Sequence, residues 1–192
     1  MEGVNALFAA ARDLQEFCRA KGWRFCIIGG IAVHRWSRPR FTKDADMTVF
    51  TQFALDDECI GGLLSRFAGL RPDAAEFARR TRVLRLVHEN GVPMDVALGA
   101  LEFELRCVER ATPWRSPEGA ELITCSAEDL IVHKSFASRG QDWVDVDCVL
   151  DAQGAKLNIP QILEELRPLA ALKEDDGIIA QLEWRLKKYR LL

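Results

Sequence analysis

The sequence has six cysteines but no Cys-x-x-Cys pair, and most of these cysteines lie among apolar neighbours. It therefore lacks the spacing typical of a zinc framework, and the pattern also argues against a secreted disulfide scaffold. Its three histidines show no metal-ligand spacing. A reduced, cytoplasmic compartment is the expectation that fits this cysteine usage best.

Long apolar runs are absent too. No uninterrupted stretch approaches the roughly 18–20 residues that a bilayer-spanning helix needs. The first residues show no basic segment followed by an apolar run, so we expect no signal peptide and no membrane partner. The net charge of −3 argues against a protein that coats nucleic acid by neutralising phosphates, although it is compatible with a local basic groove.

The chain does have enough apolar residues to form a core without disulfide bonds or a structural metal. Apolar residues make up 48% of its 192 residues, which is the balance of an ordinary globular protein. The pattern of apolar residues predicts an α/β portion over residues 1–125, followed by a helical C-terminal portion over residues 126–192. In the first portion, we expect a small mixed sheet flanked by helices.

Apolar periodicity and turn residues place the elements. The Asn90-Gly91 pair lies between two apolar runs and predicts a tight hairpin, because both residues tolerate positive φ. Strands are predicted at residues 25–28, 44–51, 83–88 and 92–98, with a weaker hairpin at 112–124. Helices are predicted at residues 7–18, 31–36, 57–67 and 73–80, then after Ser126 and around 162–169 and 178–186.

An Asp-x-Asp pair, Asp44 and Asp46, opens the second predicted strand. Side chains two residues apart on a strand project from the same face, so the two carboxylates are held close and repel each other unless a cation lies between them. Asp95 lies on another predicted strand between apolar neighbours and also needs a partner. Hard carboxylate oxygens favour Mg²⁺ or Mn²⁺, so the three aspartates are candidate metal ligands.

Gly29 and Gly30 lie between a predicted strand and a predicted helix. Glycine at such a turn lets a phosphate approach the backbone, and the following helix N-terminus favours an anion. Taken alone, the pair is better explained by a tight strand-to-helix turn without any ligand. Specificity comes only from the order Gly-Gly, Asp-x-Asp, Asp along the chain.

That order resembles the signature of the DNA polymerase β-like nucleotidyltransferase superfamily. The stretch Arg40-Phe41-Thr42-Lys43-Asp44-Ala45-Asp46 is similar to the R-x-T-x-D-x-D form of the AbiEii-type toxins and related minimal nucleotidyltransferases. The stretch from Lys134 to Asp145 resembles the K-x4-R-x2-D-x2-D segment of that group. The resemblance covers roughly residues 23–150, and the last two predicted helices carry no family signature.

The resemblance implies a nucleotidyltransferase fold and a set of roles. Asp44, Asp46 and Asp95 are then catalytic residues that ligate Mg²⁺ or Mn²⁺, with Asp95 also helping to deprotonate the acceptor hydroxyl. An NTP is the implied substrate. Its implied binding residues are Gly29, Gly30, Arg40, Thr42 and Lys134.

Several of these residues have a plain structural alternative. Lys134 either reaches phosphate or is a core-edge lysine whose ammonium extends to solvent. Arg40 and Thr42 either touch phosphate or orient Asp44. For Arg139 and Asp142, whose i, i+3 spacing makes them neighbours on a helix, an ion pair between structural residues is the favoured interpretation.

The functional hypothesis from the sequence is metal-dependent transfer of a nucleoside monophosphate from an NTP to an acceptor. The AbiEii-type resemblance implies an RNA acceptor such as tRNA, or a protein hydroxyl, in a toxin–antitoxin pair with a cognate antitoxin. Two alternatives stay open at this point. One is a small-molecule adenylyltransferase of the kind that modifies aminoglycosides, and the other is a nucleotide- or partner-binding module of the same fold without turnover.

Overall fold

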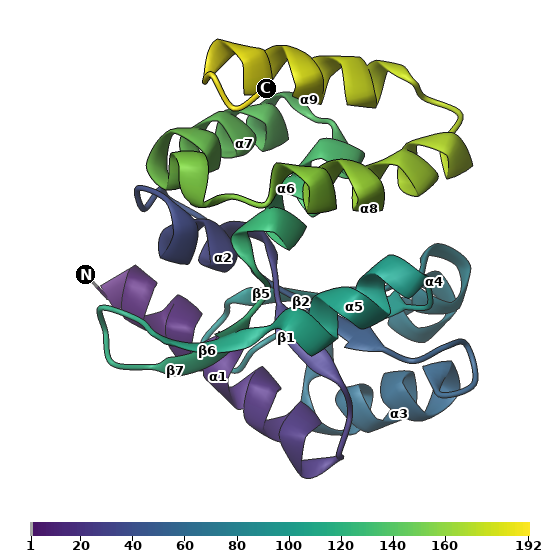
Figure 1. Ribbon diagram of the computed structural model, residues 1–192. Helices are drawn as coiled ribbons and strands as arrows, with labels where there is room; N and C mark the ends of the chain where they lie inside the picture. The colour runs from purple at the N-terminus through teal and green to yellow at the C-terminus, as the bar shows by residue number, and fades with distance from the viewer. Residues whose placement is uncertain (1) are drawn as a thin grey trace. The chain divides into compact units, whose positions relative to one another are not determined.

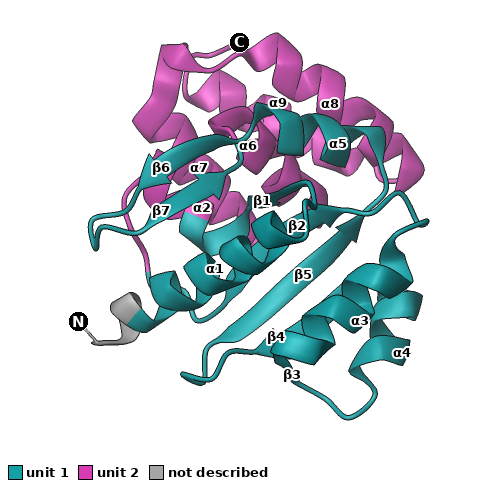
Figure 2. Cartoon of the chain, turned by 90° about the horizontal axis from the view of Figure 1, so that it is seen from below, with its two compact units in different colours: residues 1–31, 41–125 teal, residues 32–40, 126–192 magenta. Residues whose placement is uncertain are grey.

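The chain forms two compact units in the computed structural model, which describes residues 2–192. The first unit comprises Met1–Ile31 and Phe41–Cys125, and the second comprises Ala32–Arg40 and Ser126–Leu192 (Figure 2). The second unit therefore takes in residues 32–40 in addition to the C-terminal helices. The division is not a single cut of the chain at residue 125.

The first unit is built on one seven-stranded mixed sheet (Figure 1). Its strand order is β3-β4-β5-β2-β1-β7-β6, and Figure 2 labels every strand. The β2–β5 and β1–β7 pairs are parallel, and the other neighbouring pairs are antiparallel. The strands are β1 (Phe25–Ile27), β2 (Ala45–Phe50), β3 (Ala68–Gly69), β4 (Val83–Val87), β5 (Pro93–Gly99), β6 (Thr112–Arg115) and β7 (Glu121–Thr124).

Alternation along the central strands decides which face becomes the core. In β5, Met94, Val96 and Leu98 are buried, whereas Asp95 and Ala97 between them are only partly buried. Buried residues of β2 and β4 join the same cluster as the apolar sides of three helices. These helices are α1 (Glu2–Ala20), α3 (Asp56–Arg66) and α4 (Ala74–Thr81).

The opposite face carries Asp95, and it is covered differently. Helix α5 (Glu102–Arg110) contacts β1 and β2, where the thiols of Cys26 and Cys107 lie 3.6 Å apart. Helix α2 (Gly29–Trp36) starts directly after β1 at the Gly29-Gly30 turn. Along β4 and β5, this face shows an exposed Arg85 and partly buried residues. The polar face of the sheet is thus open along these two strands within the first unit.

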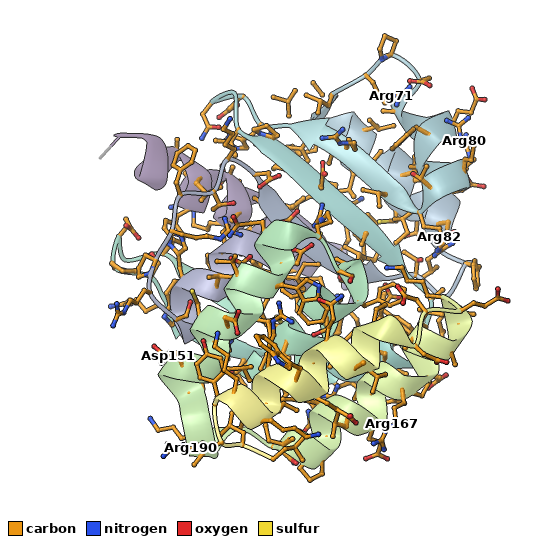
Figure 3. The ribbon with its side chains drawn as sticks, turned by 90° about the horizontal axis from the view of Figure 1, so that it is seen from above. Arg71, Arg80, Arg82, Asp151, Arg167 and Arg190 are labelled. Atoms are coloured by element: carbon orange, nitrogen blue, oxygen red, sulfur yellow. The ribbon has the colours of Figure 1, made fainter. Side chains whose placement is uncertain are left out.

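The second unit consists mainly of helices with clear start signals. The Ser126 hydroxyl accepts a hydrogen bond from the Asp129 N–H, and the Asn158 side chain accepts one from the Gln161 N–H, so both residues act as N-caps. The helices are α6 (Ala127–Ala137), α7 (Gly140–Gln153), the short 3₁₀ turn η1 (Gly154–Lys156), α8 (Ile159–Leu172) and α9 (Gly177–Lys188). Exposed side chains of this unit include Asp151, Arg167 and Arg190, which are labelled in Figure 3.

The predicted fold class is confirmed: a mixed sheet flanked by helices is followed by a helical C-terminal part. The hairpin at Asn90-Gly91 is also confirmed, with Gly91 at φ 86° between β4 and β5. Helix α5 was not predicted, because five of the nine residues of Glu102–Arg110 are charged and only Phe103 and Cys107 are buried, which is too few apolar positions to stand out in the sequence. Among the described residues, no helix is both long and apolar enough to cross a membrane.

Candidate functional site

Asp46 and Asp95 are direct register partners on the parallel strands β2 and β5. Partners on neighbouring strands project from the same face, so the two carboxylates leave the sheet side by side. Asp44 lies two residues before Asp46, immediately before β2 begins. All three aspartates are partly buried. The register therefore brings the predicted acidic residues to one face of the sheet, at the start of β2.

Gly29 makes room for the Asp46 carboxylate. A Cβ at position 29 would lie 1.9 Å from Asp46 Oδ2, and the residue has φ +61°, a conformation that favours glycine. The Ile28 N–H also donates a hydrogen bond to the Asp46 carbonyl, at 3.0 Å. The turn between β1 and α2 is therefore built around Asp46, at the N-terminal end of α2.

Gly30 plays the same part for Thr42. A Cβ at position 30 would lie 2.3 Å from Thr42 Oγ1. The Thr42 hydroxyl donates a hydrogen bond to Asp44 Oδ1 at 3.1 Å, which fixes the orientation of that carboxylate. Of the two sequence-based interpretations of Thr42, the structure shows the contact that orients Asp44.

A buried hydroxyl lies one step further along the same face of β2. Thr48 is fully buried, and its Oγ1 has no hydrogen-bond partner among the residues that the structure describes. Thr48 follows Asp46 by two residues, so both project from one face of the strand. An orphaned buried hydroxyl is costly unless a water or another polar group satisfies it. Sequence reasoning missed Thr48, since a lone threonine in a strand carries no functional signal.

Arg85 is the second residue that sequence reasoning missed. It is the antiparallel register partner of Asp95 on β4, and its Nε donates to Asp95 Oδ1 at 3.1 Å. Asp46, Asp95 and Arg85 thus form one row across three strands. The Asn90-Gly91 signal did not indicate this pairing, because a two-residue turn centred on that pair would place Arg85 opposite Val96. In the observed register the turn also takes in Glu89, and Arg85 lies opposite Asp95.

The carboxylates suit a divalent cation in donor chemistry and in register, and the space at Gly29 lets one of them sit at the turn. The Asp95 carboxylate, however, is bonded to the guanidinium of Arg85. Within residues 2–192, no group of three or more His, Cys, Asp or Glu side chains is already arranged so that it would hold a metal ion. Gathering all three aspartates around one ion therefore requires a rearrangement of side chains.

Lys134 and Arg40 lie in the second unit, where both bind Asp145. The Lys134 ammonium lies 2.9 Å from a carboxylate oxygen of Asp145 and 2.9 Å from one of Asp142. Arg40 makes a bidentate pair with Asp145, at 2.5 and 2.6 Å. The side chain of Lys134 is only 10% exposed, so its charge is neutralised inside the helical unit rather than extended to solvent.

The two buried aspartates of this cluster have lowered pKa values. Burial alone raises the pKa of Asp145, but hydrogen bonds from Arg40 and Lys134 and the charge of Lys134 outweigh it, so the pKa falls below its usual 3.8. For Asp142, burial likewise raises the pKa, and bonds from Arg139 and Lys134 lower it further than burial raises it. The predicted Arg139–Asp142 ion pair is confirmed, at 2.6 Å.

The segment that leads to the acidic pair is anchored at Arg40. Besides the side-chain pair with Asp145, the Arg40 carbonyl lies 2.6 Å from Nε2 of His34. Both contacts lie within the second unit. Direct binding of phosphate by Arg40 or Lys134 stays a prediction.

The fold that these elements define is the nucleotidyltransferase fold. No protein-family model matches the chain, and no curated protein matches it. Solved structures do resemble it. An antigenic nucleotidyltransferase-like protein from Paracoccidioides brasiliensis is 15% identical over 92% of both chains, with a TM-score of 0.53.

Two further structures are similar over much of the chain. The antibiotic-resistance factor ANT(2'')-Ia is 12% identical, covering 98% of this chain and 100% of its own, with a TM-score of 0.49. The lincosamide antibiotic adenylyltransferase LnuA, solved with lincomycin bound, is 12% identical over 71% of this chain and 91% of its own, with a TM-score of 0.42. At these identities the comparison concerns the fold alone.

Proposed function

We propose that the chain is a nucleotidyltransferase that transfers a nucleoside monophosphate from an NTP to an acceptor hydroxyl. The observation that carries this proposal is the in-register pair Asp46 and Asp95, beside Asp44 and the Gly29 turn, on a sheet of this fold. Carboxylates gathered on one face of a sheet repel one another, and this favours a role in binding cations.

In this proposal, Asp44, Asp46 and Asp95 hold Mg²⁺ or Mn²⁺ together with the triphosphate. The bound cation would neutralise the phosphate charge that builds up on the leaving pyrophosphate. Thr42 keeps Asp44 oriented through its hydrogen bond. Because Gly29 has no side chain, the backbone lies close to Asp46. This would leave space for a phosphate group at the N-terminal end of α2.

The chemistry assigned to the chain is an in-line displacement. The acceptor oxygen forms a bond to the α-phosphorus, the bond from that phosphorus to the pyrophosphate oxygen breaks, and pyrophosphate leaves. Asp95 takes the proton of the acceptor hydroxyl. Its side chain is 26% exposed, so it is accessible to an acceptor from solvent.

For the acceptor, we propose RNA, with tRNA as the first candidate and a protein hydroxyl as the next. This step rests on the similarity of residues 40–46 and 134–145 to the AbiEii-type motifs. The same similarity supports a toxin–antitoxin setting with a cognate antitoxin. Fold alone does not decide this, since one fold serves many acceptors.

The test is transfer of label from α-³²P NTPs in the presence of Mg²⁺ and cell extract. We expect labelled product from the wild-type protein and a loss of about 1,000-fold or more for Asp46→Asn, because a neutral amide no longer attracts a cation. Asp57→Asn is the matched control, since Asp57 is 79% exposed and pairs only at the surface with Arg79. Digestion of the product with ribonuclease or protease identifies the acceptor class. Equal labelling by wild type and Asp46→Asn would refute the proposal.

A further inference from the structure

The three aspartates Asp44, Asp46 and Asp95 are called the acidic row below. Arg85 places a positive charge beside Asp95, the outermost of the three. Its guanidinium bonds to Asp95 at 3.1 Å, across one strand from Asp46. The arginine side chain is 44% exposed and the aspartate 26% exposed. An arginine this accessible is free to leave its partner for solvent without unfolding anything around it.

The bond puts the guanidinium in competition with any divalent cation at Asp95. The Arg85 guanidinium and the cation are both attracted to the Asp95 carboxylate, and their positive charges repel each other at a separation of a few ångströms. The arrangement also explains why the three aspartates do not form a ready ligand group among the described residues, although their register brings them to one face.

We propose that Arg85 is a positioning residue that holds Asp95 away from the cation until the cation displaces it. Arg85 thereby sets the affinity of the acidic row for divalent ions. This inference rests on the proposed function, because it takes the row to be a cation site. It assigns Arg85 a role in ion binding that none of the sequence motifs indicates.

The experiment measures Mn²⁺ binding to the full-length protein without nucleotide, from the electron paramagnetic resonance signal of free Mn²⁺. Arg85→Gln should bind Mn²⁺ about fivefold more tightly than wild type, which is the effect expected for removal of one exposed ion pair. Arg85→Lys, which keeps the charge, should stay close to wild type. Arg79→Gln is the matched control, because it removes another exposed arginine, one that pairs with Asp57 instead.

A second comparison ties the effect to Asp95. In an Asp95→Asn background, Arg85→Gln should change Mn²⁺ affinity less than twofold, because the competing carboxylate is gone. An equal gain in both backgrounds would show a general field effect and would overturn the inference. So would unchanged or weaker binding by Arg85→Gln, with thermal unfolding confirming that the variant is folded.

The same data separate this inference from the proposed function. If wild type binds Mn²⁺, Asp46→Asn does not, and Arg85→Gln matches wild type, only the role of Arg85 is refuted. If neither wild type nor Arg85→Gln binds Mn²⁺ at millimolar concentration, the cation site fails, and the inference fails with it.

Discussion

At the scale of single residues, Gly29 shows how closely the backbone approaches the carboxylate of Asp46, a proposed metal ligand. The residue has a left-handed conformation, and a Cβ there would lie 1.9 Å from Asp46 Oδ2. Its absence of a side chain therefore serves two separate purposes. It permits the turn, and it leaves the carboxylate in place.

Gly29→Ala separates these purposes when it is compared with Gly91→Ala. Both glycines have positive φ, at 61° and 86°, but nothing lies within 4 Å of a Cβ at position 91. We expect Gly91→Ala to cost about 1–2 kcal/mol of unfolding free energy in urea from strain alone. Gly29→Ala should cost more than this and should also lose Mn²⁺ binding. Normal Mn²⁺ binding by Gly29→Ala would show that Asp46 is not fixed by this turn.

At the scale of elements, charged side chains connect segments that are distant in sequence. Arg82, labelled in Figure 3, ends α4 in a left-handed conformation at φ 60°. Its guanidinium binds the Asp56 carboxylate at 2.7 Å and the Leu98 carbonyl at 2.5 Å. One side chain thus joins the end of α4 to the start of α3 and the end of β5.

Removing this connection should destabilise the first unit without touching the acidic row. We expect Arg82→Ala to lower the free energy of unfolding by about 2 kcal/mol, because hydrogen bonds to charged groups contribute about 1.5–3 kcal/mol. Urea denaturation measures this. In an Asp56→Asn background the loss should be clearly smaller, whereas an equal loss in both backgrounds would show that the Asp56 pair contributes little.

The buried cluster around Asp145 makes the helical unit sensitive to acid. The pKa of Asp145 in the folded chain lies below 3.8, so its ionised form stabilises the fold. That stabilisation is complete above the unfolded pKa and is lost as the pH falls from near 3.8 through the folded pKa. The free energy of unfolding should therefore decrease as the pH is lowered from about 3.8 through the pKa of Asp145 in the folded protein.

The test compares wild type with Asp145→Asn in urea denaturation between pH 7 and pH 2.5. The variant should be less stable at pH 7, because Lys134 and Arg40 lose a buried partner. The difference in unfolding free energy between wild type and Asp145→Asn should become smaller as the pH falls. A difference that stays constant down to pH 2.5 would contradict the role assigned to the Asp145 carboxylate.

At the scale of the whole molecule, periodicity and turn chemistry were enough to predict the fold class. The Asn90-Gly91 pair predicted the hairpin between β4 and β5, but a two-residue turn on that pair gives a register one residue away from the observed one. Apolar runs predicted the two strands themselves. The sequence resemblance indicated the nucleotidyltransferase fold, which the structure confirms. Periodicity fails for α5, where a mostly charged helix buries only two apolar residues.

The candidate site was only partly predictable. Motif order named the aspartates and glycines, but the contacts of Arg40, Lys134 and Arg85 depend on which distant carboxylate each one meets. Arg40 finds Asp145 at a separation of 105 residues, which no local pattern specifies. Likewise, the close approach of Gly29 to Asp46 depends on packing between a turn and a strand.

The discontinuity of the helical unit has a consequence for synthesis on the ribosome. Residues 32–40 leave the ribosome early, whereas Asp145, which neutralises Arg40, follows 105 residues later. At about 5–20 residues per second, that interval is on the order of 5–20 s. Residues 32–40 therefore wait for their helical partners while the intervening residues 41–125 are made, so this unit is completed only after the sequence of the first unit has been synthesised.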